Sequence, residues 1–306
     1  MAIGGVINTG SHPKALWPGI HAFWGQIFNE HPTEYTDLFE IEDSDKAYEE
    51  DVQVTGFGLA QVKPEGSPVS YDSEVQGPVT RYVHVAYALG YIVTYEEMRD
   101  NLYEQIAMRR SKANAFSITQ TIENIAAGFY NRAFNTAYTL ADGQPLISTA
   151  HPFTTGGSFS NAISPAADLS EAALEDACIQ LMGFQTDRGL LVNFMPRSLH
   201  VPRQEWYNDN RILKSVLQND TANNAVNVLK ATNAFPEGIK LNHYFTAPHA
   251  WFVRTNAMNG LQFFWRDRPT FDQDNDFSTK NALASTYMRF SLGCTDPRAI
   301  IGSNGP

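Results

Sequence analysis

One short stretch of the chain carries the three groups of a hydrolytic triad. Ser148, His151 and Asp142 have the chemistry of a nucleophile, a base and an acid. The serine is not part of a GxSxG turn, which is the arrangement that exposes such a nucleophile. A trio of this kind arises by chance in a chain of 306 residues. We therefore expect Asp142-Gly143 and His151-Pro152 to shape a long loop, and a soluble hydrolase is the less favoured alternative.

Residues with metal or redox chemistry are present but poorly placed. Asp272, Asp274 and Asp276 alternate as in a calcium loop. That loop needs Gly where Phe277 stands and Glu where Leu283 stands. No His and Cys spacing fits zinc, and two cysteines cannot form a disulfide scaffold. Phosphate-loop, GxGxxG and HExxH motifs are also absent. The sequence therefore predicts no catalytic residue, no cofactor and no metal ion.

Composition limits the class of function. Lys and Arg number 22 against 33 Asp and Glu, so the net charge is -11. This balance argues against a protein that grips nucleic acid or a membrane through basic patches. Hydrophobic residues make up 43% of the chain, which predicts a sizeable core. No apolar run approaches the ~20 residues of a membrane span, and no signal peptide is visible at the N-terminus. The expected compartment is the cytoplasm.

The residues before position 52 predict an arm, a short helix and an acidic segment. Residues 1–14 are small and polar, as in an extended arm. Five apolar residues then recur at helical spacing, and Pro32 ends the pattern. This stripe is either ordinary core or an anchor between subunits. Residues 30–51 are rich in acids and predict a solvated face. The stripe consists of Ile20, Phe23, Trp24, Ile27 and Phe28.

Residues 52–93 have the pattern of a long two-stranded excursion. Apolar residues alternate around Gly56, at positions 52, 54, 57 and 59. Residues 63–68 have turn chemistry. Alternation returns from Val83 to Val93, which predicts a strand with one buried face. A lone two-stranded ribbon is marginal in water, so we expect this one to lie on something else.

A long helix should follow. Thr94 and Glu97 form a capping box, and an apolar stripe continues to Ala133 without Pro or Gly from Tyr95 to Ala127. A helix of about 35–40 residues is roughly 50–60 Å long. Such a helix is a structural strut, bent midway.

The remaining residues predict shorter helices and strands. Ser170 is an N-cap with a Leu169–Leu174 staple, and this helix should stop near Gly189. A further helix should run from Pro202 to Leu217. This pattern is α+β. The expected strands are residues 190–194, 198–201, 239–245, 251–254, 261–265 and 286–301.

Four stretches, in this order, are similar to those of phage capsid subunits. They are residues 46–50, then 87–91 with 94–98, then 140–146 with 148–152, and finally 297–302. With the order of elements, they make nearly the whole chain resemble the Hong Kong 97 fold of tailed-phage major capsid proteins.

The resemblance implies a domain plan for an α+β capsid fold. Residues 1–45 would be the N-terminal arm, and residues 46–93 an extended β-hairpin loop reaching over a neighbouring subunit. The spine helix, from Thr94 to about Asn135, would lie in a peripheral domain of residues 94–145 and 261–296. Residues 146–260 and 297–306 would form the axial α/β domain.

The implied function is structural, without enzymatic activity. Copies would self-assemble through hexamers and pentamers into the icosahedral head shell around the double-stranded DNA of a tailed phage, without sequence-specific DNA binding and without a membrane. A portal and a decoration protein are further expected partners. Because the arm begins close to Met1, a separate scaffolding protein is expected. The location would be the virion, and the host cytoplasm during assembly. An encapsulin-like nanocompartment shell is the alternative.

The residues expected at subunit interfaces lie on the arm and the hairpin loop. The ribbon is too thin to bury its own apolar side chains, so a neighbouring chain must cover them. A compact monomer of this mass should expose about 12,800 Å², and we expect this chain to expose more. Some relatives form a Lys–Asn crosslink, for which Lys63 is the only sign. The expected interface residues are Trp17, Phe23, Trp24, Val54, Phe57, Leu59, Lys63, Pro64, Glu65 and Gly66.

Overall fold

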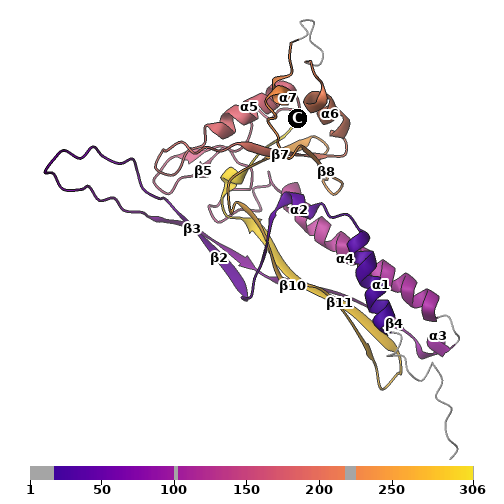
Figure 1. Ribbon diagram of the computed structural model, residues 1–306. Helices are drawn as coiled ribbons and strands as arrows, with labels where there is room; N and C mark the ends of the chain where they lie inside the picture. The colour runs from indigo at the N-terminus through magenta and orange to yellow at the C-terminus, as the bar shows by residue number, and fades with distance from the viewer. Residues whose placement is uncertain (1–16, 100–102, 218–224, 306) are drawn as a thin grey trace, which may run out of the picture.

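The computed structural model describes residues 17–99, 103–217 and 225–305. Two units are visible, an upper one with short helices and a lower elongated one with a long helix and a long strand pair (Figure 1). The chain exposes 17269 Å², well above the roughly 12,800 Å² of a compact monomer of its mass. The expectation of an extended, incompletely covered chain is therefore confirmed.

The lower unit contains a four-stranded sheet, here called the first sheet. Its order is β1-β10-β11-β4, with β1 parallel to β10 and the other pairs antiparallel. Apolar side chains on one face of β10 and β11 are buried, among them Phe263, Trp265 and Phe290. The strands are β1 (Glu40–Asp43), β10 (Leu261–Asn275), β11 (Ala282–Cys294) and β4 (Val85–Val93).

Helices cover the buried face of the first sheet. The predicted capping box is present, since the Glu97 backbone N–H donates to the Thr94 hydroxyl and the Thr94 N–H donates to the Glu97 carboxylate, both at 3.4 Å. The predicted strut is assigned as two helices, because residues 100–102 lie outside the described residues. The helices are α1 (Trp17–Glu30), α2 (Tyr35–Leu38), α3 (Tyr95–Arg99) and α4 (Tyr103–Asn131).

The upper unit is built on a second sheet of order β12-β9-β7-β8. The Ser170 cap is confirmed, because its hydroxyl accepts from the Ala173 N–H at 3.2 Å. Leu169 and Leu174 are both buried, as the staple requires. The elements are β7 (Pro196–Pro202), β8 (Ile239–Asn242), β9 (Ala250–Thr255), β12 (Ile300–Asn304), α5 (Glu171–Met182), α6 (Trp206–Lys214), α7 (Val228–Ala231), the short strands β5 (His151–Pro152) and β6 (Ser158–Phe159), and η3 (Pro297–Ala299).

Several predicted bounds in these units are wrong. Residues 192–194 form no strand, and α5 ends at Met182 rather than near Gly189. The helix after Pro202 begins at Trp206 and ends at Lys214. The strand predicted at 261–265 continues to Asn275, because pairing with β11 extends it through polar residues that carry no apolar alternation.

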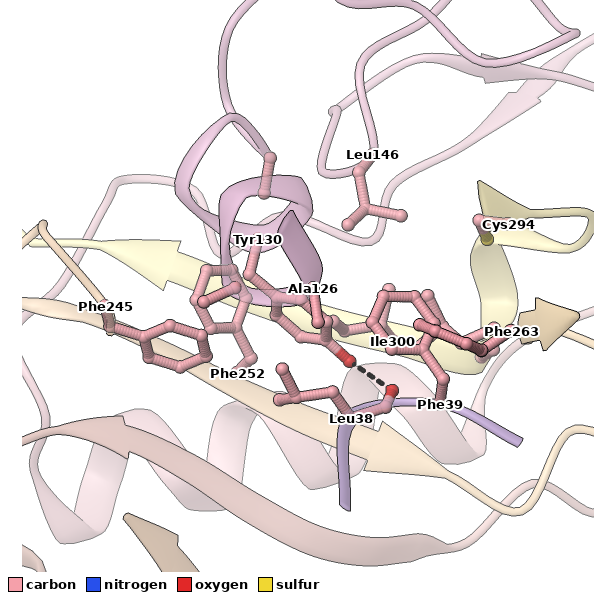
Figure 2. Close-up of a cluster of buried hydrophobic side chains, with 14 of the residues drawn as sticks. Leu38, Phe39, Ala126, Tyr130, Leu146, Phe245, Phe252, Phe263, Cys294 and Ile300 are labelled. Atoms are coloured by element: carbon pink, nitrogen blue, oxygen red, sulfur yellow. Dashed lines mark hydrogen bonds between the residues drawn. The ribbon is translucent and has the colours of Figure 1, made fainter. Parts of the chain in front are cut away.

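A shared core joins the two units. Tyr130 of α4 is buried, and its hydroxyl donates to the Leu38 carbonyl at 2.8 Å (Figure 2). Its ring packs against Phe245 and, edge-on, against Phe252 of β9. Phe263 of β10 belongs to the same cluster. The long helix therefore holds the second sheet and the first sheet in one packed body.

A two-stranded ribbon leaves this body. Strands β2 (Tyr48–Val54) and β3 (Gln76–Val83) pair antiparallel, and the outer part of the loop between them projects away from both units (Figure 1). The predicted alternation beyond Val54 is wrong as a strand, since residues 55–75 have no regular structure and Gly56 turns the chain with φ +67°. The strand predicted from Val83 breaks at His84, and β4 then joins the first sheet.

Candidate functional site

The projecting loop, residues 55–75, presents apolar side chains to solvent. Leu59 is 75% exposed and Phe57 is 60% exposed, and Val54 at the end of β2 is also exposed. Uncovered apolar groups at this density are costly in water and are typical of a surface that another chain covers. The rest of the exposed apolar set is Val62, Val69, Tyr71 and Val75.

The base of the ribbon is fixed to the first sheet by Tyr82. This side chain is 2% exposed, and its hydroxyl lies 2.6 Å from the Thr295 hydroxyl. Its ring meets Phe264 of β10 edge-on, with the centroids 5.0 Å apart. The ribbon therefore leaves the body from a buried aromatic joint, which sets its direction.

His84, between β3 and β4, forms a second fixed point. Its Nδ1 lies 2.9 Å from the Ser291 hydroxyl, and its Nε2 lies 3.1 Å from the Ser44 hydroxyl. Burial is the main cause that lowers the pKa of His84, and the nearby Arg289 guanidinium lowers it further. The ring is therefore held neutral, and it joins the residue after β1 to strand β11.

The ribbon also contacts the upper unit. The Asp72 carboxylate accepts from the Gly58 N–H at 2.8 Å and lies 3.5 Å from the Arg188 guanidinium. Arg188 also donates to the Ser73 carbonyl. These contacts hold the returning arm of the loop beside residues 186–189, while the apolar outer part of the loop stays uncovered.

The Asp142–His151 stretch forms a buried hydrogen-bonded hub. His151 Nδ1 lies 2.6 Å from the Asp142 carboxylate, and Nε2 lies 3.1 Å from Asn161 Oδ1. The Asn161 amide donates to the Leu146, Pro297 and Ile300 carbonyls, which places its oxygen toward the histidine. The loop is thereby tied to the chain's last strand.

This geometry does not form a nucleophilic site. The Ser148 hydroxyl donates to Gln144 rather than to His151, and both ring nitrogens of the buried histidine have other partners. The predicted loop-shaping role of the stretch is confirmed. Across residues 17–99, 103–217 and 225–305, no three His, Cys, Asp or Glu side chains converge as metal ligands.

Two carboxyl groups are buried in unfavourable surroundings. Glu123 of α4 accepts from the Glu34 N–H at 2.8 Å, and burial raises its pKa to about 7. Asp209 of α6 has no hydrogen-bond partner for either carboxylate oxygen within the described part of the chain, and burial raises its pKa to about 8. Both groups lie inside the units, away from the ribbon, so they bear on stability.

The predicted interface residues fall into three sets. Trp17 and Phe23 lie outside the residues whose side chains are described. Trp24 is 4% exposed and stacks on Phe28 and Phe271, so the core interpretation holds for this residue. The third set lies on the ribbon and its loop, and all its residues are exposed. Gly66 lies in a turn and has φ +79°. It comprises Val54, Phe57, Leu59, Lys63, Pro64, Glu65 and Gly66.

The fold and the uncovered ribbon define a subunit of a larger assembly. No helix in the described ranges is both long and apolar enough to cross a bilayer. A family model described as phage capsid protein matches residues 78–303, which is most of the chain. The chain belongs to the phage capsid protein family, and it is a structural shell subunit of a phage.

Solved structures agree with this fold at low sequence identity. No curated protein sequence matches the chain. The capsid of the Cyanophage P-SCSP1u has 12% identity and a TM-score of 0.56, covering 90% of this chain and 88% of that one. The structure of Mycobacterium phage Patience has 10% identity and a TM-score of 0.53, covering 100% and 94%. A virus-like particle from Pyrococcus furiosus has 11% identity and a TM-score of 0.52, covering 94% and 98%. The predicted Hong Kong 97-type fold is confirmed.

The family match also bears on the alternatives. Similarity of fold alone does not separate a phage shell from the particle of Pyrococcus furiosus, because the TM-scores are nearly equal. The phage capsid family model favours the phage shell, and the encapsulin-like alternative is not favoured. The chain is a structural protein located in the capsid of the virion.

Proposed function

We propose that the apolar loop of each copy completes its burial on a neighbouring copy in an icosahedral head shell. The exposure of Phe57 and Leu59 carries this proposal, since a free chain gains nothing from holding them in water. Each square ångström of apolar surface covered contributes about 25 cal/mol before the costs of association. Many such contacts then sum to a stable container. The proposed contact residues are Val54, Phe57, Leu59, Lys63, Pro64, Glu65 and Gly66.

The domain plan is part of this proposal. Residues 1–45 act as an arm and 46–93 as the hairpin loop. Residues 94–145 and 261–296 act as the peripheral domain, which meets neighbouring capsomers. Residues 146–260 and 297–306 act as the axial domain, which meets its copies at the centres of hexamers and pentamers. One hydrophobic cluster supports an axial domain, because all its buried residues lie within 169–253 or at Ile301.

The remaining partners follow from the shell role. We expect a separate scaffolding protein, a portal and a decoration protein, with assembly in the host cytoplasm. The shell would enclose the double-stranded DNA of a tailed phage without reading its sequence. The charge of -11 supports this, because a wall of low affinity for phosphate lets DNA pass during packaging and ejection. No enzymatic activity is expected.

Expression and imaging of particles test this function. The chain is produced in a bacterial host, with its scaffolding protein where assembly requires one, and the products are examined by sedimentation and electron microscopy. We expect the expressed chain to form closed shells. In phage particles, we expect DNA that a nuclease digests only after the particles are opened. A monodisperse monomer under all these conditions contradicts the shell role. Particles filled with protein cargo contradict the DNA-enclosing role.

A further inference from the structure

The far end of the first sheet presents an aromatic side chain on a preformed turn. Phe277, between β10 and β11, is 99% exposed. The turn beneath it is closed by backbone bonds, from the Lys280 N–H to the Asp276 carbonyl at 2.8 Å and from the Asp276 N–H to the Asn281 carbonyl at 3.0 Å. The Asp276 carboxylate accepts from the Ser278 N–H at 2.9 Å. A backbone turn held in this way loses little conformational freedom when it binds.

This turn is also fixed to the body of the chain. The Asn281 side-chain oxygen accepts from the Tyr95 N–H, at the start of α3, at 3.1 Å. The Lys280 ammonium lies 5.6 Å from the centroid of the Tyr95 ring. The position of Phe277 relative to the helices is therefore set before any partner arrives.

Two unpaired acids precede this aromatic group on β10. Asp272 and Asp274 are exposed on β10, and neither forms an ion pair within the described part of the chain. We call Phe277 with these two carboxylates the hairpin tip. The hairpin tip thus combines an exposed aromatic group with two carboxylates that have no ion-pair partner in the described residues, while the cation of the turn, Lys280, lies over the Tyr95 ring.

The outer side of α4 has the opposite character. Met108, Lys112 and Phe116 recur four residues apart and so share one side of the helix, with Arg109 beside them. Met108 is 42% exposed, Phe116 is 49% exposed, and both cations are exposed. Neither cation forms an ion pair with any residue that the structure describes. We call these four residues the α4 stripe.

Within one chain, helix α1 packs against both α4 and β10. The Trp24 ring of α1 stacks on Phe271 of β10, with centroids 5.4 Å apart, while its indole N–H donates to Asn114 of α4 at 3.0 Å. Helix α1 therefore packs between α4 and β10, and the charges on their outer surfaces stay unpaired inside the subunit.

We propose that the hairpin tip of one copy docks on the α4 stripe of a second copy. The occupant is a second copy because this chain is a shell subunit, and because the two surfaces match in both apolar character and charge sign. Phe277 then packs on the exposed apolar groups of the stripe, and each unpaired carboxylate gains a cation. The proposal rests on the shell function and adds a contact separate from the ribbon loop.

Charge reversal with rescue tests this contact. One variant carries Asp272→Lys and Asp274→Lys, a second carries Arg109→Glu and Lys112→Glu, and a third combines all four changes. We expect each pair to slow shell assembly about tenfold, because complementary charge raises association rates by one order of magnitude or more. The third variant should regain most of the wild-type rate, measured by light scattering and electron microscopy.

A photo-crosslinking amino acid at position 277 gives a second readout that does not depend on the charges. Copies with and without heavy-isotope labels are mixed, assembled and irradiated. We expect mixed-label crosslinks to peptides containing residues 108–116. The matched control is the same amino acid at Met258, which is 85% exposed and outside both surfaces.

The outcomes separate this contact from the shell function itself. If wild-type shells form and the four-residue combination assembles no better than either pair, the docking of tip on stripe is wrong. Mixed-label crosslinks from position 277 that map only elsewhere also overturn it. If wild-type chains form no shells, the shell function has failed. Circular dichroism of each unassembled variant identifies any loss of fold.

Discussion

The ring of Tyr82 occupies the space that a side chain at position 293 would need. A Cβ added to Gly293 would lie 2.8 Å from Tyr82 Cε1, which is closer than real Cβ atoms approach. Strand β11 therefore leaves a gap in its outer face, and the base of the ribbon fills it. This single contact couples the direction of the ribbon to the first sheet.

Substitution of Gly293 by Ala should disturb this joint. The added methyl forces the Tyr82 ring to move, and overpacking of this kind costs about 1–3 kcal/mol in the free energy of unfolding. Chemical denaturation of the unassembled chain measures the loss. The control is Gly128→Ala in α4, where no atom outside the adjacent residues and the helix's own backbone lies within 4 Å of the added Cβ, and where Ala should be neutral or stabilising. Equal effects of the two changes would contradict the proposed joint.

Substitution of Asn161 by Leu should destabilise the chain strongly. Its amide serves five partners, and removing it leaves buried carbonyl groups and one His151 nitrogen without a bond. Each unsatisfied buried group costs about 1–3 kcal/mol, so we expect a total loss of several kcal/mol. Asn124→Leu, which removes one exposed bond to Gln120, is the control and should cost little. Thermal melts of the two variants measure their losses of stability, and equal losses would contradict the role of Asn161.

The extent to which the sequence predicts this fold depends on local signals. The Thr94 capping box and the Ser170 cap could be predicted, because each depends only on residues a few positions apart in the sequence. The full length of β10 could not be predicted, because its outer half is polar and forms a strand only through its pairing with β11.

The candidate site shows the same division. The exposed loop could be predicted, because apolar residues on a thin ribbon have nothing in their own chain to cover them. The Tyr82 joint and the hub around Asn161 could not, since their partners lie far away in the sequence, at Thr295 and Ile300. The stripe containing Trp24 is open to two interpretations in the sequence, and only the fold shows that Trp24 and Ile27 face inward.

Stability should fall as the pH rises from 6.5 to 8.5. Burial raises the pKa of Glu123 to about 7 and that of Asp209 to about 8, so the folded chain holds protons that the unfolded chain has released. The stability contributed by each neutral carboxyl is full below its ordinary pKa and is lost as the pH rises through the raised value. His84, with its lowered pKa, acts in the opposite sense only below about pH 6.5.

Thermal melts of the unassembled chain across this range check the sign. For Asp209 the expected loss is about 2 kcal/mol. Asp209→Asn and Glu123→Gln should each flatten the pH dependence, whereas Asp176→Asn, at an exposed position of α5, should leave it unchanged. A wild-type stability that does not fall between these pH values would contradict this account, because carboxyls ionised in both the folded and the unfolded state give no pH dependence.

Polar substitution of the ribbon loop should separate assembly from folding. Phe57→Ser with Leu59→Ser changes side chains that are already in water, so the unfolding free energy of the free chain should shift by no more than about 0.5 kcal/mol. Shell yield should nevertheless fall sharply, since the apolar cover between copies is lost. Ile179→Ser, at a 66% exposed position of α5, serves as the comparison. A double variant that assembles like the wild type would mean that the loop carries no assembly energy.

Cryo-electron microscopy of the assembled particle tests the central claim most directly, by locating residues 55–75 in the shell. The account predicts that Phe57 and Leu59 of each copy lie against a neighbouring copy and are largely buried there. A shell in which this loop remains surrounded by solvent, or is folded back on its own subunit, would contradict it.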